Sequence, residues 1–348
     1  MSPSEKTGKR AWIRRQDGFS MLEMLITLFI LLSVAGIVMA AMMQMTNTQG
    51  SVANRTAMHS SIRSATELLQ QEIGQAGKIA VPPASLGGPT QTTTPIAAAL
   101  ITNTDIGYTG PISLDGAAGM YSGMQLVIDT GDQEETVAVT NLVTATKTFT
   151  GTFFLPHATG VPVRVVGAFG SGVVPTNYTC LVGSTLVNCG STKYLLKLYG
   201  DINDDGIMQY IEYYCDTSGG NLYRDAMSFT AGSKPALSGL TTTPSLVLLP
   251  NITANPADPG APGVPAPCFK YQEQLVTPNT YVTDVSVTLT VQTQNLDPQT
   301  HVVQKETKAL LNVSPRNIFE GWQLGGGGVK NRIQPIPATV TNLLPDTP

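Results

Sequence analysis

A long apolar segment near the N-terminus constrains this 348-residue chain more than any other feature of its sequence. From Phe19 to Met43 the one charged residue is Glu23, and the next charge along the chain is Arg55. As a helix, a run of about 25 residues extends about 37 Å at ~1.5 Å per residue, which is long enough to cross a bilayer. Basic residues gather before the run, and basic flanks stay on the cytoplasmic side. The sequence therefore predicts one membrane-spanning helix with the bulk of the chain outside the cytoplasm.

The residues from Gly18 to Glu23 resemble the class III signal of type IV pilins and type II secretion pseudopilins. In that family a prepilin peptidase cuts after a glycine, the new N-terminal phenylalanine is methylated, and a glutamate stands fifth. The resemblance implies cleavage between Gly18 and Phe19 and methylation of Phe19. It also implies that Glu23 pairs with an N-terminal amine during assembly, since a lone carboxylate in hydrocarbon is costly. Asp17 departs from the family pattern, in which a basic residue is commoner.

The resemblance also implies partners and a location. The partners are the prepilin peptidase, the inner membrane and other pilins that contact the N-terminal helix. The protein would be a single-pass inner-membrane protein with its head in the periplasm, and later part of a pilus at the cell surface. The alternative is an ordinary secretory signal, for which residues 35–40 offer a weak small-residue cleavage site.

Composition indicates a loop-rich β domain behind this helix. The chain is 42% hydrophobic and 13% charged, with 34 glycines and 24 prolines. Removal of residues 1–18 leaves 15 basic and 22 acidic residues, a net charge of −7. An acidic chain of this kind does not suit a surface that coats nucleic acid, so no nucleic-acid partner is expected.

An amphipathic stripe continues beyond the apolar run and ends before Gly77. Its apolar residues recur at spacings of three and four: Met58, Ile62, Ala65, Leu69, Ile73 and Ala76. We therefore expect an α+β protein in which a long helix, transmembrane and then amphipathic, packs on an antiparallel β-sheet head. The expected divisions are a leader (1–18), the helix (19–78), a connector (79–118), an inserted β subdomain (119–170), the sheet head (171–320) and a flexible tail (321–348).

Short runs rich in Val, Thr and aromatic residues predict the strands. In the insertion these runs are 124–129, 135–142, 147–154 and 161–166. In the head they are 194–199, 210–215, 222–227, 285–292 and 301–313, with a hairpin turn at 218–221. The pair that ends in Leu222, Tyr223 and Arg224 resembles a strand pair of PilW-like minor pilins and J-type pseudopilins.

Four cysteines, an even number in an exported chain, favour disulfides. Three pairings are possible. A short loop separates Cys180 from Cys189, which favours that pair and leaves Cys215 with Cys268. Four buried free thiols are the alternative. No CxxC spacing occurs and the three histidines are scattered, so these residues do not predict a metal site.

Residues 201–212 fit the twelve-residue calcium loop D-x-[DN]-x-[DN]-G-x5-E. The candidate ligands are Asp201, Asn203, Asp205, the carbonyl of Ile207, Gln209 and Glu212. Gly206 would permit the sharp turn. The flanks read as strands rather than as paired helices, so an ordinary polar turn is the alternative reading. Ca²⁺ is the one cofactor that the sequence suggests.

No catalytic motif was found, and the chain is not expected to be an enzyme. The family resemblance implies a PilW-like minor pilin that takes part in initiation or tip formation of a type IV pilus. The alternative within the family is a J-type pseudopilin of type II secretion, which gene neighbourhood would separate. The alternative from another class is a membrane-anchored, calcium-dependent adhesin.

Overall fold

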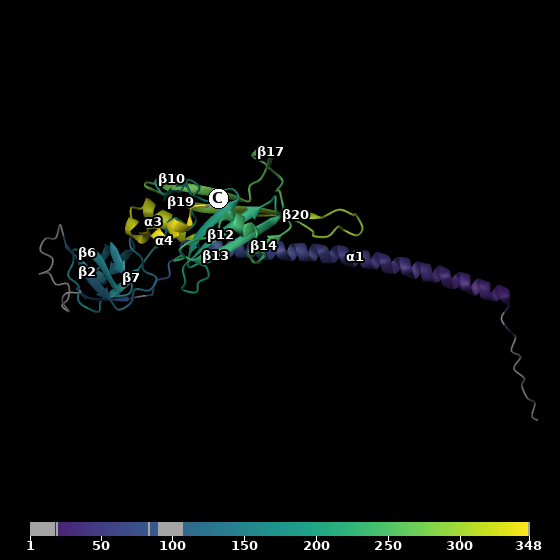
Figure 1. The fold of residues 1–348 in the computed structure, drawn as a ribbon, viewed down its shortest axis with the longest axis horizontal. Helices are drawn as coiled ribbons and strands as arrows, with labels where there is room; N and C mark the ends of the chain where they lie inside the picture. Colours follow the sequence, from purple (N-terminus) through teal and green to yellow (C-terminus); the bar gives the residue numbers. More distant parts are fainter. Residues whose placement is uncertain (1–17, 19, 83, 90–106, 347–348) are drawn as a thin grey trace, which may run out of the picture.

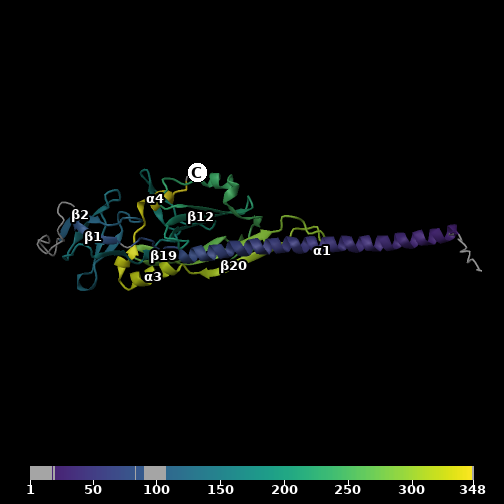
Figure 2. The same cartoon turned by 90° about the horizontal axis from the view of Figure 1, so that it is seen from below.

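The computed structural model describes residues 18, 20–82, 84–89 and 107–346, and in it a long helix carries a β-rich head at one end (Figure 1). Helix α1, Met21–Gln75, has 55 residues, and the side chain of Ser20 caps its first turn by accepting from Leu22 N. The first half of α1 projects away from the head, and the second half runs along it (Figure 2). The predicted α+β class is confirmed.

The stripe on the second half of α1 is buried as the spacing predicts. Met58, Ile62, Leu69 and Ile73 are at most 7% exposed and pack on the head strands. Seven residues of the helix are buried in total, and all of them lie at or beyond Met58. A helix that binds a sheet through one face buries one residue in every three or four, which is the observed pattern.

The helix ends where the chain must pass very close to another segment. Gly77 has φ +82°, and a Cβ there would lie 2.8 Å from the carbonyl oxygen of Phe169. The same two residues are joined by a hydrogen bond from Phe169 N to Gly77 O at 2.9 Å. Glycine is therefore required at this position by both backbone conformation and space.

The head contains two antiparallel four-stranded sheets that adjoin beside α1. The first has the order β11-β12-β13-β14: Leu195–Gly200, Gln209–Asp216, Asn221–Ser228 and Val247–Pro250. In the second sheet, the long strand β19, Asn279–Gln292, pairs with three others. These are β15 Ile252–Thr253, β18 Phe269–Val276 and β20 Lys305–Val313. The predicted hairpin at 218–221 is confirmed, because Asp216 pairs with Asn221 across it.

A seven-stranded sheet lies at the end of the molecule opposite the N-terminal end of α1 (Figure 1). We call residues 84–165 the distal subdomain. Its strand order is β4-β3-β7-β1-β2-β6-β5, and the strands are β1 Ala84–Pro89, β2 Tyr108–Leu114, β3 Gln125–Ile128, β4 Glu135–Ala138, β5 Asn141–Val143, β6 Thr148–Phe153 and β7 Pro162–Val165. The strands β4 and β5 stand at opposite ends of this order yet follow each other in the chain, so the sheet curls back on itself.

The boundary of this subdomain differs from the prediction. Strands β1 and β2 fall in the stretch 79–118 that the sequence assigned to a connector, so the subdomain begins at Ala84 rather than at 119. Leu86, Ile112 and Leu114 are at most 6% exposed, and these apolar residues alternate with polar ones. Gly, Pro and Thr around them hid this alternation in the sequence.

The C-terminal region is also ordered up to Asp346, contrary to the predicted flexible tail. It contains α3 Arg316–Gly326, β21 Ile333–Gln334 and α4 Ala338–Leu343. Ile318, Val340 and Leu343 are 0% exposed, so burial of apolar side chains holds the segment on the head. The glycines at 325–328 end α3 and do not begin a free tail.

The remaining elements are short and lie in connections. They are η1 Gly131–Gln133, β8 Ala168–Phe169, β9 Thr179–Val182, β10 Thr185–Asn188, α2 Leu237–Thr241, η2 Pro244–Leu246, β16 Ala257–Asp258, β17 Ala261–Pro265 and η3 Lys330–Arg332.

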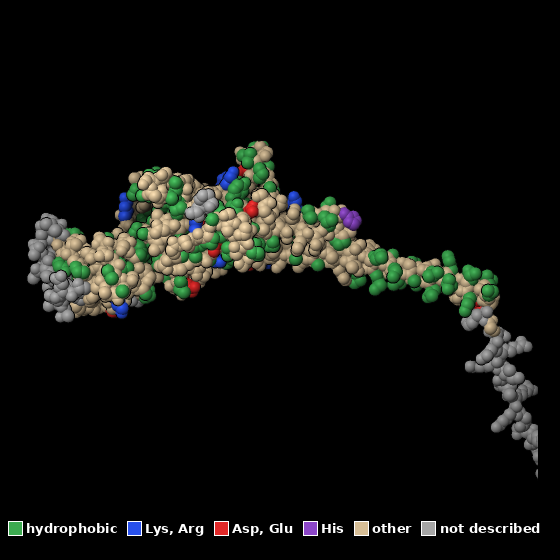
Figure 3. All heavy atoms as spheres, in the orientation of Figure 1, with side chains coloured by type: hydrophobic (Ala, Val, Ile, Leu, Met, Phe, Trp, Pro, Cys, Tyr) green, Lys and Arg blue, Asp and Glu red, His purple; other side chains and the backbone are tan. Residues whose placement is uncertain are grey.

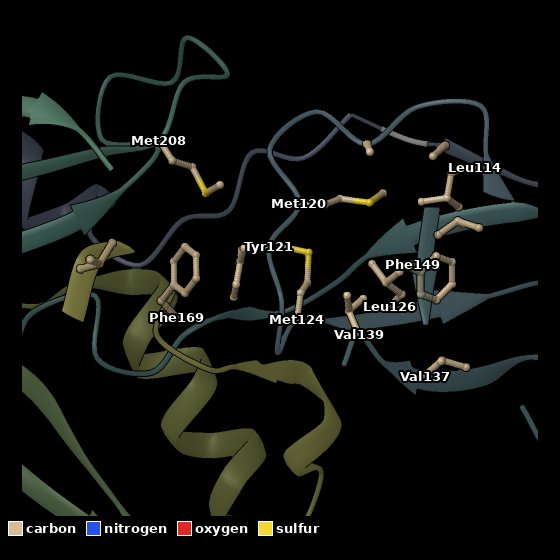
Figure 4. Close-up of a cluster of buried hydrophobic side chains, with 14 of the residues drawn as sticks. Leu114, Met120, Tyr121, Met124, Leu126, Val137, Val139, Phe149, Phe169 and Met208 are labelled. Atoms are coloured by element: carbon tan, nitrogen blue, oxygen red, sulfur yellow. The ribbon is translucent and has the colours of Figure 1, made fainter. Parts of the chain in front are cut away.

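Two hydrophobic cores result. One lies between α1 and the two head sheets. The other fills the distal subdomain and extends into the head (Figure 4). At the junction Phe169 packs between Tyr121 and Tyr199, with ring centroids 6.1 and 5.0 Å away. The distal subdomain is therefore continuous in its packing with the head.

Candidate functional sites along the helix and head

The first half of α1 carries the residues that the family resemblance singled out. Glu23 lies in the first turn of α1, and Gly18 is exposed, whereas Phe19 lies outside the described residues. Every large hydrophobic side chain from Met21 to Met45 is between 51% and 92% exposed. Figure 3 shows hydrophobic side chains along the visible face of the free part of the helix. Among the described residues this helix alone is long and apolar enough to cross a membrane.

A buried ion pair joins the second half of α1 to the head. Glu72 is 1% exposed and accepts hydrogen bonds from Arg224 Nη2 at 2.5 Å and Arg224 Nε at 3.1 Å, and from the Tyr213 hydroxyl. Burial opposes the charge on Arg224, but the hydrogen bonds and charge of Glu72 outweigh it and raise the pKa of Arg224. Burial, followed by the charge of Glu72, raises the pKa of Tyr213. Arg224 belongs to the motif of residues 222–224 that the sequence analysis identified, whereas no sequence pattern indicated the role of Glu72.

The first part of the predicted calcium loop folds as a compact turn. Asp201 Oδ1 accepts from the backbone N–H groups of Asp205 and Gly206 at 3.1 and 3.3 Å. Its other oxygen, Oδ2, lies 3.1 Å from Lys78 Nζ. Lys78 also contacts the Asp204 carboxylate, which, with a smaller contribution from Asp201, raises the pKa of Lys78 against the effect of burial. The ammonium group of Lys78 thus pairs with Asp201, the first predicted calcium ligand of the loop.

The other ligands predicted for this loop do not converge on one point. Asn203 Nδ2 is 3.4 Å from Gln209 Oε1, and Asp205 Oδ1 accepts from the backbone of Ile207 at 2.9 Å. Glu212 lies in β12, 1% exposed, and turns away from the loop. Its Oε1 accepts from the Tyr210 hydroxyl and from Lys234 Nζ, each at 2.5 Å.

The twelve-residue calcium set therefore does not fit as predicted. Glu212 already has a lysine partner, and Lys78 competes for Asp201. Within the described residues no three His, Cys, Asp or Glu side chains are grouped as a metal site. Calcium binding stays a prediction, and any binding would depend on the first nine positions of the loop without the bidentate glutamate.

A second buried charge network was not foreseen from the sequence. Lys197 of β11 is 0% exposed, and its Nζ lies 2.7 Å from Leu344 O and 2.9 Å from Asp346 Oδ1. Lys234 reaches the same carboxylate at 2.9 Å. Burial, with the nearby charge of Lys234, lowers the pKa of Lys197. Two lysines thus hold the C-terminal segment against the head.

Both predicted disulfides are present, and the described residues contain no free cysteine. Cys180 and Cys189 close the β9–β10 hairpin with a Cα–Cα distance of 6.0 Å. Cys215 of β12 and Cys268, directly before β18, are 6.5 Å apart and join the two head sheets. The second bridge therefore fixes the surface on which α1 packs.

The distal subdomain contains a buried histidine between two carboxylates. His157 Nδ1 lies 3.2 Å from Asp129 Oδ2, and Nε2 lies 2.6 Å from Glu135 Oε1. Burial opposes the charged imidazole, but hydrogen bonds to Glu135 and Asp129 outweigh burial and raise the pKa of His157. The carboxylates lie on opposite sides of the ring, an arrangement that suits an ion-paired clamp rather than a shared metal.

A family model, the prokaryotic N-terminal methylation motif, matches residues 13–39. The match covers Gly18, Phe19, Glu23 and much of the apolar half of α1. This match supports a type IV pilin-like protein. The motif implies processing by prepilin peptidase, and with the single apolar helix it is consistent with anchoring in the inner membrane. No curated protein and no solved structure matches the chain.

Proposed function

We propose that this protein is a PilW-like minor pilin that helps to initiate or cap a type IV pilus. The observation that supports this role is the position of the distal subdomain beyond the C-terminal end of α1 (Figure 1). In a filament built by bundling N-terminal helices, α1 runs along the filament. A large subdomain beyond its C-terminal end would occupy the space of the subunit ahead, so a terminal position suits this shape better than a repeated one.

The buried Glu72–Arg224 pair supports the same proposal. It ties the head to the helix by a charge-assisted contact, so that force on the helix reaches the sheets directly. In a subunit that begins a filament, the head must keep a fixed position relative to its helix. The two residues that contact Glu72, Tyr213 and Arg224, lie in the strand pair that resembles PilW-like proteins.

The proposal is tested by deleting the gene and counting surface pili, with a gold label on the distal subdomain in the complemented strain. We expect few or no pili in the deletion strain and label at filament ends. Label along the whole shaft would contradict a terminal role. Normal pili with lost attachment would support an adhesin instead, and a defect in protein secretion with intact pili would support a J-type pseudopilin.

A further inference from the structure

The loop between β19 and β20 lies where α1 leaves the head. It spans residues 293–304 and reaches along α1 toward the free end of the helix (Figures 1 and 2). Gln299 Nε2 donates to Thr48 Oγ1 at 3.2 Å, and Ser51 Oγ donates to Asp297 Oδ2 at 3.0 Å. These two contacts fix the loop beside residues 48–51 of the helix.

The loop is held in one shape by its own hydrogen bonds. Asp297 Oδ1 accepts from Gln299 N at 2.8 Å, Asp297 N donates to Val302 O at 3.0 Å, and His301 N donates to Asp297 O at 2.8 Å. The backbone of Gln299, together with Ser51 and other donors, lowers the pKa of Asp297. The one carboxylate in the loop is therefore turned inward and satisfied within the fold.

Two apolar side chains of this ordered loop face solvent. Leu296 and Val302 are each 57% exposed. Because the backbone of the loop is already fixed, burial of these two side chains against a partner costs little ordering entropy. The position of the loop beside α1 indicates which partner these side chains contact.

The helix sets the height of the loop relative to a membrane. Met45 is the last large residue of the exposed apolar stretch. Thr48 and Ser51 follow it by about 4.5 and 9 Å along the axis at ~1.5 Å per residue. The headgroup layer on each side of a bilayer is about 5–7 Å thick. When the apolar stretch spans the hydrocarbon, Thr48, which Gln299 contacts, therefore lies at the level of the lipid headgroups, and Ser51 lies just outside that layer.

The charges around the loop suit lipid phosphates. Arg55, His301 and Lys305 are exposed, and among the described residues none of them forms an ion pair with a carboxylate. Arg55 Nε donates to Gln304 Oε1 at 2.5 Å, which holds this cation beside the loop. Arg55 and Lys305 thus carry positive charge beside the loop although the mature chain is acidic. Within about a Debye length of an anionic surface such cations are attracted to it.

We propose that the β19–β20 loop is a lipid contact, in which Leu296 and Val302 enter the headgroup layer while Arg55 and Lys305 lie above it and are attracted to the anionic surface. The contact holds the head at a fixed height above the bilayer while the helix is still in the membrane. It does not depend on which filament the protein enters.

The test uses the full chain in nanodiscs of phosphatidylcholine and phosphatidylglycerol. The photo-crosslinker p-benzoylphenylalanine replaces Leu296, and the matched control replaces Leu186, which is 71% exposed on the β9–β10 hairpin. After irradiation, intact mass detects lipid adducts. We expect several-fold more lipid adduct at position 296 than at 186, with the same result at 302.

A second arm tests the charges. In an R55Q/K305Q variant the fraction of adducts formed with phosphatidylglycerol should fall at position 296, while the phosphatidylcholine adduct persists. Lipid adducts at 296 no more abundant than at 186 would overturn the proposal. Crosslinks from 296 to a second protein chain, without lipid adducts, would overturn it equally and identify the loop as a subunit interface.

Discussion

The two halves of α1 have the same backbone conformation and opposite surroundings. From Met58 onward the apolar stripe is buried against the two head sheets, and Glu72 has two partners there. From Met21 to Met45 every large apolar side chain is exposed, and the carboxylate of Glu23 has no hydrogen-bond or ion-pair partner among the described residues. The apolar side chains and the carboxylate of the second half are buried and paired within the same chain, whereas those of the first half need lipid or other subunits.

Replacement of Glu23 by Val should have the largest effect of all on assembly. Because Glu23 contributes nothing to the packing of the head, the E23V chain should fold with an unchanged Tm and yet fail to enter or initiate filaments. Pilus counts and thermal melts of the same variant check this. Ser33→Ala, a change in the same exposed stretch, is the control and should assemble normally. Normal piliation of E23V would break the contrast between the two halves.

Removal of the Cys215–Cys268 bridge should give the largest loss of stability, because it joins the sheets beneath the second half of α1. In the chain-entropy model its 53-residue separation corresponds to about 4 kcal/mol, against about 2–3 kcal/mol for the short Cys180–Cys189 loop. Denaturant unfolding of the two double-serine variants measures both losses. An equal or reversed order would show that the bridge between the sheets is not what supports the helix.

Glu72→Gln should cost about 3 kcal/mol, because it leaves Arg224 partly buried without its counter-ion. Glu67→Gln is a matched control on the same helix, since Glu67 pairs with Arg63 on the surface with side chains 62% and 77% exposed. Exposed pairs contribute little, so E67Q should melt close to the parent. Similar losses in the two variants, measured by thermal and denaturant unfolding, would contradict the proposed difference between the faces of α1.

The distal subdomain, which α1 does not cover, should depend on pH through His157. Its pKa is raised above the ordinary value of about 6.5, so its stabilisation is fully present below that value and is lost as pH rises through the folded-state pKa. Melts should therefore show a distal subdomain that is more stable at pH 6 than at pH 8. H157Q should cost about 1.5 kcal/mol at pH 6 and abolish this dependence. A parent protein with equal stability at both pH values would refute the clamp.

Calcium should have the smallest effect, at the loop where Lys78 follows the end of α1. A weak extracytoplasmic site with a Kd of about 10⁻³ M gains about 0.6 kcal/mol at a free calcium concentration of about twice its Kd. In the K78M variant the ammonium no longer competes for Asp201, so the calcium increment should grow. Melts of the full chain in calcium and in chelator measure it, with E212Q as a variant that should leave the increment unchanged. No increment in either parent or K78M would reduce the loop to an acidic turn.

Sequence periodicity predicted α1 and most head strands because burial repeats regularly along them. Glu72 could not be assigned a partner in the same way, since Tyr213 and Arg224 lie 141 and 152 residues further along the chain. The twelve predicted positions of the calcium loop do not converge on one point, for a local reason. Glu212 belongs to a strand, and alternate residues of a strand share a face, so Glu212 points with Tyr210 toward Lys234 and away from the loop.

The hydrogen bond between Gly77 and Phe169 has a consequence for how such proteins can diversify. The chain leaves the end of α1, builds the distal subdomain and returns to within 2.9 Å of its point of departure. An insertion whose ends meet imposes almost no spacing on its host, so its length and content can change while the helix and the two head sheets keep their positions. The outer strands of the distal subdomain can thus change most readily, whereas Tyr121, which packs on Phe169 at the junction, must keep its contact with the head.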